Sequence, residues 1–311
     1  MAHHLNLMEA QQSLLISTLN LIQLRTSYFQ EQVFREVVVV TKSSIFVKCR
    51  FEDCQETESG ALVSSGSNEL VVEQTDFLRC SSKTKCAGLK KENGKLLMDC
   101  CLLKECHGKI DNDIFGTAMG SSNCDAKILD TTFLMCWKAA SPYADSVYGL
   151  YKGTADINGI NCSRCISRGG GLAGSLNEVE SGVELRYIQG VQSEEHNAFE
   201  AFQTEHTINY MNIINNTFTH RFFNAYQTKL TVISGCFFKN DCYNNYGTVE
   251  LINCISDGLL GATFQEDIST IKFDVNECRT SRRFTQREDK NPLLIVMVWL
   301  LMNLAHLEIS T

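Results

Sequence analysis

The stretch Phe51-Glu52-Asp53-Cys54 decides the fold of this chain, because it returns along the sequence at nearly constant intervals. Four later copies follow it, and they are Phe77-Leu78-Arg79-Cys80, Leu103-Lys104-Glu105-Cys106, Phe133-Leu134-Met135-Cys136 and Cys162-Ser163-Arg164-Cys165. Successive copies begin 26, 26, 30 and 29 residues apart. A motif that recurs at such intervals indicates a repeat architecture, in which each unit buries its apolar face against its neighbours.

Weaker copies extend the series in both directions. One copy begins at Phe29, and later copies begin at Ile188, Phe218, Phe237, Cys254 and Val275. Each repeat also has an alternating apolar run before the motif, such as Leu70-Val71-Val72, and a small-residue element after it, such as Gly60-Ala61-Leu62. Because alternation is typical of strands with one buried face, each repeat predicts three short strands.

Three short strands in each repeat predict one coil of a parallel β-helix. A single coil cannot bury its own inward face, so coils stack about 4.8 Å apart and equivalent residues form ladders. We therefore expect an all-β fold, a single-stranded right-handed parallel β-helix over residues 13–280 with short terminal caps. Leucine-rich repeats and stacked helical repeats are excluded, because the leucine spacing and a sustained period of 3.6 residues are both missing.

The same motifs carry a resemblance to known repeat families. Alternation of Phe-x-x-Asn/Cys with Gly-Gly-Ala-aliphatic elements is similar to the repeat of polymorphic membrane proteins (Pmp) of the autotransporter type. It resembles even more closely the Cys-rich, Pmp-like surface proteins of anaerobic parasitic protists. Phe51 to Cys54 with Gly60-Ala61-Leu62, and Phe77 to Cys80 with Ala87-Gly88-Leu89, are the best matches within residues 20–280. The resemblance implies a pectin-lyase-like right-handed β-helix displayed at a cell surface.

The composition is that of a folded, acidic protein. Of the 311 residues, 44% are apolar and 21% are charged, so the chain can bury a core and is not intrinsically disordered. The formal net charge of −8 argues against a nucleic-acid partner, because binding to phosphates needs a basic stripe. Composition alone therefore indicates a soluble domain with an acidic surface.

Fifteen cysteines are present, and five of them occupy the fourth place of the motif. These five are Cys54, Cys80, Cys106, Cys136 and Cys165. Residues stacked in successive coils have Cβ atoms nearly 5 Å apart, beyond the roughly 3.5 to 4.5 Å that a disulfide needs, so we expect a ladder of buried thiols. Two alternatives stay open. One is disulfides between pairs such as Cys80 with Cys86 or Cys236 with Cys242; the other is a metal bound by Cys162 and Cys165, or by Cys100, Cys101, Cys106 and His107.

The two ends of the chain differ from its middle. We expect a cap segment at residues 1–12, a charged linker at 281–292, and an apolar helix at 293–307, which is a cap or a marginal membrane anchor. That apolar run is shorter than the roughly 20 residues that cross a bilayer. No clear secretory signal precedes the repeats. The resemblance implies the cell surface or a membrane, and the alternative compartment is the cytoplasm.

Catalysis would need acidic residues that meet on one outer face. Two connectors carry such groups, His107 with Asp111 and Asp113, and Glu194 with Glu195 and His196. Neither matches the motifs of hydrolases on this fold, so we expect no catalytic, cofactor-binding or metal site. The prediction is a non-catalytic scaffold, surface-displayed or adhesin-like, that binds a protein or a carbohydrate. The alternative is a polysaccharide lyase or hydrolase, in which Asp111, Asp113, Glu194 and Glu195 would converge in a groove.

Two further sets of residues have a structural and a functional interpretation. The sequons Asn161-Cys162-Ser163 and Asn215-Asn216-Thr217 favour asparagines stacked in a ladder over glycan sites. The longest repeat contains Trp137, Tyr143, Tyr148 and Tyr151. We expect these aromatic side chains to pack on their own coil, with an outward contact patch as the alternative.

Overall fold

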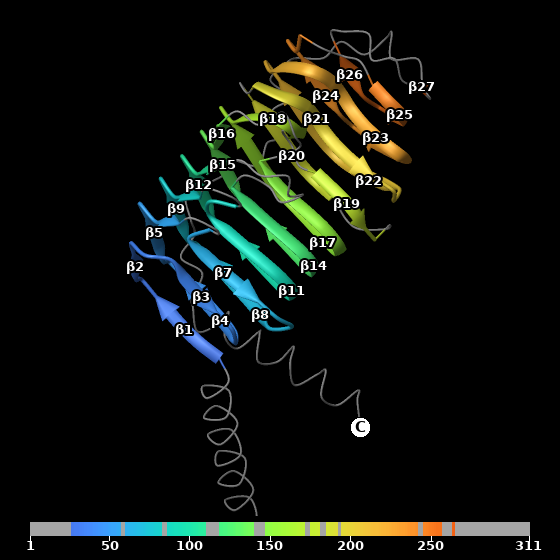
Figure 1. Cartoon of the computed structure of the whole chain (residues 1–311). Coiled ribbons are helices and arrows are strands. Elements are labelled where there is room, and N and C mark those ends of the chain that lie inside the picture. The colour runs from blue at the N-terminus through green and yellow to red at the C-terminus, as the bar shows by residue number, and fades with distance from the viewer. Residues whose placement is uncertain are drawn as a thin grey trace, which may run out of the picture. The chain divides into compact units, whose positions relative to one another are not determined.

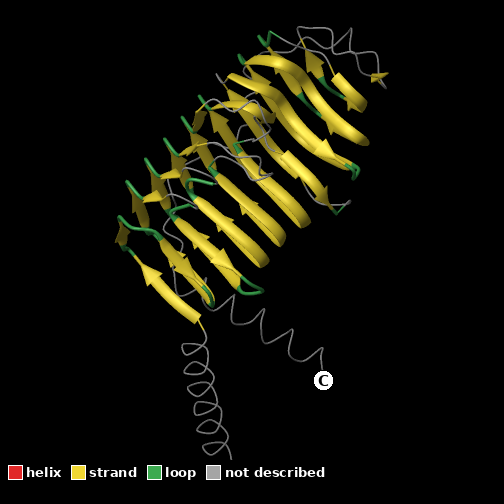
Figure 2. Ribbon diagram, in the orientation of Figure 1, coloured by secondary structure: helices red, strands yellow, loops and turns green. Residues whose placement is uncertain are grey.

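The computed structural model describes residues 26–56, 60–82, 86–109, 118–139, 147–171, 175–180, 185–191, 194–241, 245–256 and 263–264. Within them lie 27 strands, β1 to β27, whose pairings are all parallel, and no helix (Figures 1 and 2). Apart from the first and last strands of each face, the strands pair with their equivalents one repeat earlier and one repeat later. The prediction of an all-β, right-handed parallel β-solenoid is confirmed.

The strands around each coil form four faces, which we name in chain order. The entry face holds β1 (Thr26–Gln30), β4 (Ser43–Val47), β8 (Glu69–Glu73), β27 (Thr263–Phe264) and the first parts of β20 (Leu185–Val191) and β22 (His206–Ile214). The last residues of β20 and β22 continue into the anchor face. The anchor face, which carries the repeated motif, holds β2 (Val33–Phe34), β5 (Arg50–Glu52), β9 (Asp76–Leu78), β12 (Leu102–Lys104), β15 (Thr132–Leu134), β24 (Cys236–Phe238) and β26 (Ile255–Ser256).

The exit face follows the motif, and the return face leads into the next coil. The exit face holds β6 (Gln55–Glu56), β10 (Ser81–Ser82), β13 (His107–Lys109), β16 (Trp137–Ala139) and β18 (Ile166–Gly171), and the return face holds β3 (Val38–Val40), β7 (Leu62–Ser65) and β19 (Ser175–Val179). The remaining strands are long and bend through two or more faces: β11 (Leu89–Asp99), β14 (Met119–Leu129), β17 (Tyr148–Ser163), β21 (Glu194–Phe202), β23 (Thr217–Ile233) and β25 (Asn245–Ile252).

One inward position of the anchor face runs through the whole described stack. Strand register aligns Phe34, Phe51, Phe77, Leu103, Phe133, Cys162, Gly190, Ile213, Phe237 and Ser256. The four copies predicted after Phe51 and the weak copy at Phe237 are therefore confirmed in register.

The other weak copies are wrong in register. Phe29 pairs with Phe46 on the entry face, and Phe218 pairs with Glu195. The anchor positions fall at Gly190 and Ser256, two residues after the predicted Ile188 and Cys254. Residues two apart in a strand face the same side, so an apolar pattern alone cannot distinguish them. The copy predicted at Val275 lies outside the described residues.

Aromatic rings stack along the first coils of the core. The ring centroids of Phe34 and Phe51 are 4.8 Å apart, and those of Phe51 and Phe77 are also 4.8 Å apart with planes only 5° from parallel. Spacing between coils dictates this distance, and offset stacked rings are favourable at it. Later coils pack differently, because Phe222 and Phe223 meet Phe237 edge to face at 5.2 and 5.6 Å.

Both bends that flank the anchor face use left-handed backbone, and in most coils the residue is not glycine; Gly159 on the entry side is an exception. On the exit side these residues are Asp53, Arg79, Glu105, Met135 and Arg164, with φ between 51° and 55°. The bend keeps the backbone ladder intact, since the amide of Asp53 donates to the carbonyl of Leu78 at 3.0 Å. Such backbone is costly for most L-residues, so the register of the coils must impose it.

Glycine is needed instead where the chain enters the return face. A Cβ atom at Gly60 would lie 2.6 Å from the carbonyl oxygen of Cys86, and one at Gly88 would lie 2.8 Å from that of Ala118. These positions confirm the prediction that a side chain would collide with the next coil. The predicted cap at residues 1–12 and the segments at 281–292 and 293–307 lie outside the described residues. Nowhere in the described ranges does a helix long and apolar enough to cross a bilayer occur.

Candidate functional site

The acidic residues that would define an enzyme are placed only in part. Asp111 and Asp113 lie outside the described residues. Glu194 and Glu195 are neighbours in β21, where Glu194 pairs with Ile166 and Thr217 on the adjoining strands. Their convergence in a groove is therefore untested.

The aromatic residues of the longest repeat are placed only in part. Tyr148 is completely buried and stacks on Phe133 with ring centroids 5.4 Å apart, so it belongs to the core, as the packing interpretation predicted. Tyr151 is half-buried, and its hydroxyl donates to Glu178 at 3.3 Å. Trp137 lies in β16, and Tyr143 lies outside the described residues.

An aromatic column that sequence inspection missed lies on the outside of the return face, over β21, β23 and β25. Phe202 and Tyr226 have ring centroids 6.1 Å apart, and Tyr226 and Tyr246 follow at 6.0 Å with nearly parallel planes. Tyr226 is 41% exposed and Tyr246 is 42% exposed. Aromatic side chains are enriched where proteins bind partners.

Polar groups of fixed orientation border this column. The guanidinium carbon of Arg221 lies 4.0 Å from the ring centroid of Tyr246, and its Nη1 donates to Asn224 Oδ1 at 3.1 Å. Asn224 in turn donates to the buried carboxylate of Glu200 at 3.1 Å, as does the buried Asn197 at 2.5 Å. We call Phe202, Arg221, Asn224, Tyr226 and Tyr246 the tyrosine–arginine patch.

Register explains how the sequence builds the patch. Strands β21, β23 and β25 follow one another in successive coils (Figure 1). Phe202 pairs with Tyr226, and Asn224 pairs with Tyr246, so the outward residues of the three strands are neighbours. The inward neighbours Phe199, Phe223 and Ala225 are fully buried. In the sequence, inward apolar residues alternate with outward aromatic residues in these strands. The pattern was missed because the repeated motif is weak in these coils.

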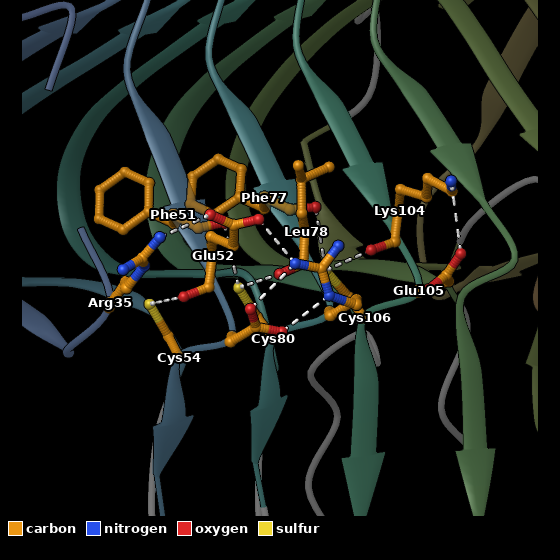
Figure 3. Close-up of polar contacts among 12 residues, drawn as sticks. Arg35, Phe51, Glu52, Cys54, Phe77, Leu78, Cys80, Lys104, Glu105 and Cys106 are labelled. Carbon is orange, nitrogen blue, oxygen red and sulfur yellow. Dashed lines mark hydrogen bonds and ion pairs between the residues drawn. The ribbon is translucent and has the colours of Figure 1, made fainter. Parts of the chain in front are cut away.

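A second outer feature is a column of ion pairs beside the anchor face (Figure 3). Arg79 binds Asp53 through Nε at 2.7 Å and Glu52 through Nη2 at 2.7 Å, and Arg35 lies 3.7 Å from Glu52. The hydrogen bond from Arg79 lowers the pKa of the Asp53 carboxyl below its usual value. All these groups are solvent-exposed to some degree, so they favour the register of the coils more than they stabilise the fold.

The predicted thiol ladder is confirmed. Cys54, Cys80, Cys106, Cys136 and Cys165 are buried and carry thiols. Each Sγ lies close to the carbonyl oxygen of the anchor residue one coil earlier: the distances are 3.6 Å for Cys54 to Phe34, 3.6 Å for Cys80 to Phe51, 3.5 Å for Cys106 to Phe77, 3.3 Å for Cys136 to Leu103 and 3.5 Å for Cys165 to Phe133.

Neighbouring thiols of the ladder also affect one another's pKa. A hydrogen bond with Cys80, followed by burial, raises the pKa of the Cys54 thiol, and contact with Cys136 and Cys80 raises that of Cys106. The alternative of a Cys80–Cys86 disulfide is excluded, because both residues carry thiols. Cys236 does form a disulfide, and its predicted partner Cys242 lies outside the described residues.

The larger ligand set of the metal alternative, Cys100, Cys101, Cys106 and His107, does not come together among the described residues. Cys106 and Cys165 belong to the thiol ladder, and Cys101 lies at the opposite bend, with Sγ 3.3 Å from the carbonyl oxygen of Val72. Ligand atoms of Asp99, Cys100 and Asp130 instead lie within 4.8 Å of one another at that bend. Two carboxylates and one thiol could hold a divalent cation, although such acidic clusters are common without one.

The sequons differ from each other. Asn161 is half-buried and accepts a hydrogen bond from the hydroxyl of Ser163 at 2.8 Å. Asn215 is exposed in left-handed backbone, so the expectation that it stacks in a ladder is wrong. The stacked asparagine is Asn216, whose Nδ2 donates to Asn240 Oδ1 at 3.2 Å. The interpretation was displaced by one residue, because consecutive residues at a bend point to opposite sides.

No protein-family model, curated protein or solved structure matches this sequence. The parallel β-solenoid fold stands on the strand pairing itself. The likeness to pectin-lyase-like proteins and to Cys-rich protist surface proteins stays a prediction from the repeated motifs.

Proposed function

We propose that this chain is a non-catalytic β-solenoid scaffold that binds a carbohydrate chain through the tyrosine–arginine patch. The observation that carries the proposal is the pair of tyrosines, Tyr226 and Tyr246, held about 40% exposed in one column by paired strands. A parallel sheet fixes their spacing, so little conformational entropy is lost when a ligand binds.

The chemistry around the column suits a sugar. The apolar C–H faces of sugar rings pack against aromatic side chains, and their hydroxyl groups need planar donors and acceptors close by. The guanidinium of Arg221 and the amide of Asn224 supply such groups, and their contacts with Tyr246 and Glu200 hold them in place. A protein partner would use the same aromatic and arginine anchors, so the two ligand classes need an experimental distinction.

The test compares Tyr226→Ala/Tyr246→Ala with Tyr28→Ala. Tyr28 is 44% exposed on β1, in the first described coil, and serves as a matched control for loss of surface aromatic area. The purified full chain would be applied to an array of polysaccharides and oligosaccharides. Binding that the double variant loses and the control keeps supports the proposal, whereas equal binding by all three proteins contradicts it.

A carbohydrate-active enzyme is the second candidate, and Glu200 is the observation that favours it. Its carboxylate is buried beside the patch and accepts hydrogen bonds from two amides. Glycoside hydrolysis uses a pair of carboxylates, so Glu200 would need a partner. Product release from a bound glycan that Glu200→Gln abolishes would establish the enzyme and contradict the scaffold.

A further inference from the structure

We propose that the thiol ladder is a binding site for a soft monovalent metal ion, Cu(I), held linearly between thiolates of successive coils. Five cysteines, Cys54, Cys80, Cys106, Cys136 and Cys165, occupy one bend in consecutive coils, all are buried, and none is in a disulfide. Backbone hydrogen bonds between coils, such as those from Ser81 to Cys54 and from His107 to Cys80, place adjacent members one above the other. Thiolates are the ligands that Cu(I) prefers.

The spacing of the ladder excludes one bridge and fits another. Stacked strands lie about 4.8 Å apart, which is too far for the Cβ atoms of a disulfide without backbone movement. If each metal–thiolate bond is about as long as the zinc–sulfur bond of roughly 2.3 Å, two such bonds in a line span about 4.6 Å, close to the separation of the coils. An ion that accepts two ligands in a line therefore fits where an S–S bond does not.

The binding step exchanges protons for metal and transfers no electrons. Two S–H groups each release a proton to solvent, and one Cu(I) ion forms two Cu–S bonds. One negative charge is left on each pair. Because each ion displaces two protons, uptake of Cu(I) should strengthen as pH rises. Five stacked thiols form two separate pairs, which sets a limit of two ions held this way.

The opposite bend of the same coils provides an internal control. There Cys49 and Cys101 alternate with Thr75 and Thr131, as the backbone bonds from Asp76 to Cys49, from Leu102 to Thr75 and from Thr132 to Cys101 show. Each thiol of that bend is separated from the next by a hydroxyl side chain. The two bends thus have similar backbone and burial but differ in whether thiols are adjacent.

Two double variants with equal numbers of thiols test the proposal. Cys80→Asn/Cys136→Asn leaves no two adjacent thiols in the ladder, and asparagine already occupies this bend at Asn216 and Asn240. Cys49→Thr/Cys101→Thr removes two thiols from the opposite bend and leaves the ladder whole. The full chain would be titrated anaerobically with Cu(I) in the presence of a chromophoric Cu(I) chelator.

We expect the unaltered protein and the Cys49→Thr/Cys101→Thr variant to withdraw Cu(I) from the chelator, and Cys80→Asn/Cys136→Asn to lose this ability. Equal withdrawal by both variants, or equal loss in both, would overturn the proposal. If circular dichroism shows that the ladder variant is unfolded, X-ray absorption of the Cu(I)-loaded unaltered protein decides. Two sulfur neighbours per copper support the ladder, and nitrogen or oxygen neighbours contradict it.

Discussion

The same bend of the solenoid is built from thiols in the first coils and from amides in the later ones. Cys106 follows its anchor residue Leu103 by three positions, and Asn240 follows Phe237 by the same three. Cys106 Sγ lies 3.5 Å from the carbonyl oxygen of the preceding anchor, Phe77. Asn240 Nδ2 donates to the equivalent carbonyl oxygen, that of Ile213, at 2.8 Å. The two side chains thus make the same contact with different chemistry.

The difference shows what the bend requires. A thiol is a small apolar group with a weak donor, so it fills the space at little cost in desolvation. An amide both donates and accepts, and Asn240 Oδ1 accepts from the backbone amide of Asn216 at 3.1 Å as well as from its side chain. The thiol coils are therefore held by packing, whereas the amide coils are held by directional hydrogen bonds whose loss leaves polar groups buried.

The largest loss of stability is expected from Phe77→Ala in the thiol coils. Phe77 is completely buried and stacks on Phe51 with ring centroids 4.8 Å apart. Removal of the ring leaves a cavity that rigid neighbouring coils cannot close, so the free energy of unfolding should fall by about 3 to 5 kcal/mol. Chemical denaturation measures it, and an unchanged midpoint would show that aromatic stacking does not hold these coils together.

Most of the fold could be predicted from the sequence, and the reason is visible in the two kinds of bend. Phe51 to Cys54 and its next copies are recognisable because a cysteine marks the fourth place. Ile213-Ile214-Asn215-Asn216 has the same shape with asparagine in that place, and its aliphatic anchor made it resemble an ordinary strand. The register of the later coils is set by contacts between coils, which no single repeat contains.

The candidate site was much less predictable. Tyr226 and Tyr246 are 20 residues apart in sequence, and Tyr246 pairs with Asn224, two residues before Tyr226, next to a shift of register that begins after Ala225. A bulge of this kind re-aims side chains and leaves no consistent spacing in the sequence. The thiol ladder was predictable because its members keep a constant offset from their anchors.

The next largest loss of stability is expected at low pH, from an inward position of the entry face. Leu70 and Leu96 occupy this position in the thiol coils, and His206 with Leu230 occupies it in the amide coils. His206 is 3% exposed, and burial lowers its pKa to about 4 from the usual 6.5. Because the unfolded chain binds the proton more readily, stability is complete above about pH 6.5 and is lost as pH falls toward 4.

A shift of this size corresponds to a loss of about 3 kcal/mol across that pH window. His206→Leu, which copies the residue found in the thiol coils, should remove this part of the pH dependence. Denaturation at pH 7 and at pH 4.5 measures it, and carboxylates elsewhere affect both proteins alike. Parallel pH profiles for the two proteins would mean that His206 is hydrated or partnered in solution.

The smallest effect compares the two bends directly, through Asn240→Ala and Cys106→Ala. Loss of the Asn240 amide removes partners from Asn216 and from the carbonyl of Ile213, and should lower the free energy of unfolding by about 1 to 3 kcal/mol. Loss of the Cys106 sulfur removes packing and a weak donor, and should cost about 1 kcal/mol.

The reciprocal exchanges make the comparison sharper. Asn240→Cys retains the volume of the bend but cannot accept from the backbone of Asn216, so it should be nearly as unstable as Asn240→Ala. Cys106→Asn can donate to the carbonyl of Phe77 as Asn240 does to Ile213, but its own oxygen would face a thiol on each side. We expect both exchanges to destabilise the chain, because the side chains of each bend fit the chemistry of their own neighbours. Equal stability of Asn240→Cys and the unaltered protein would show that the bend needs only volume, and that the amides contribute no net stability.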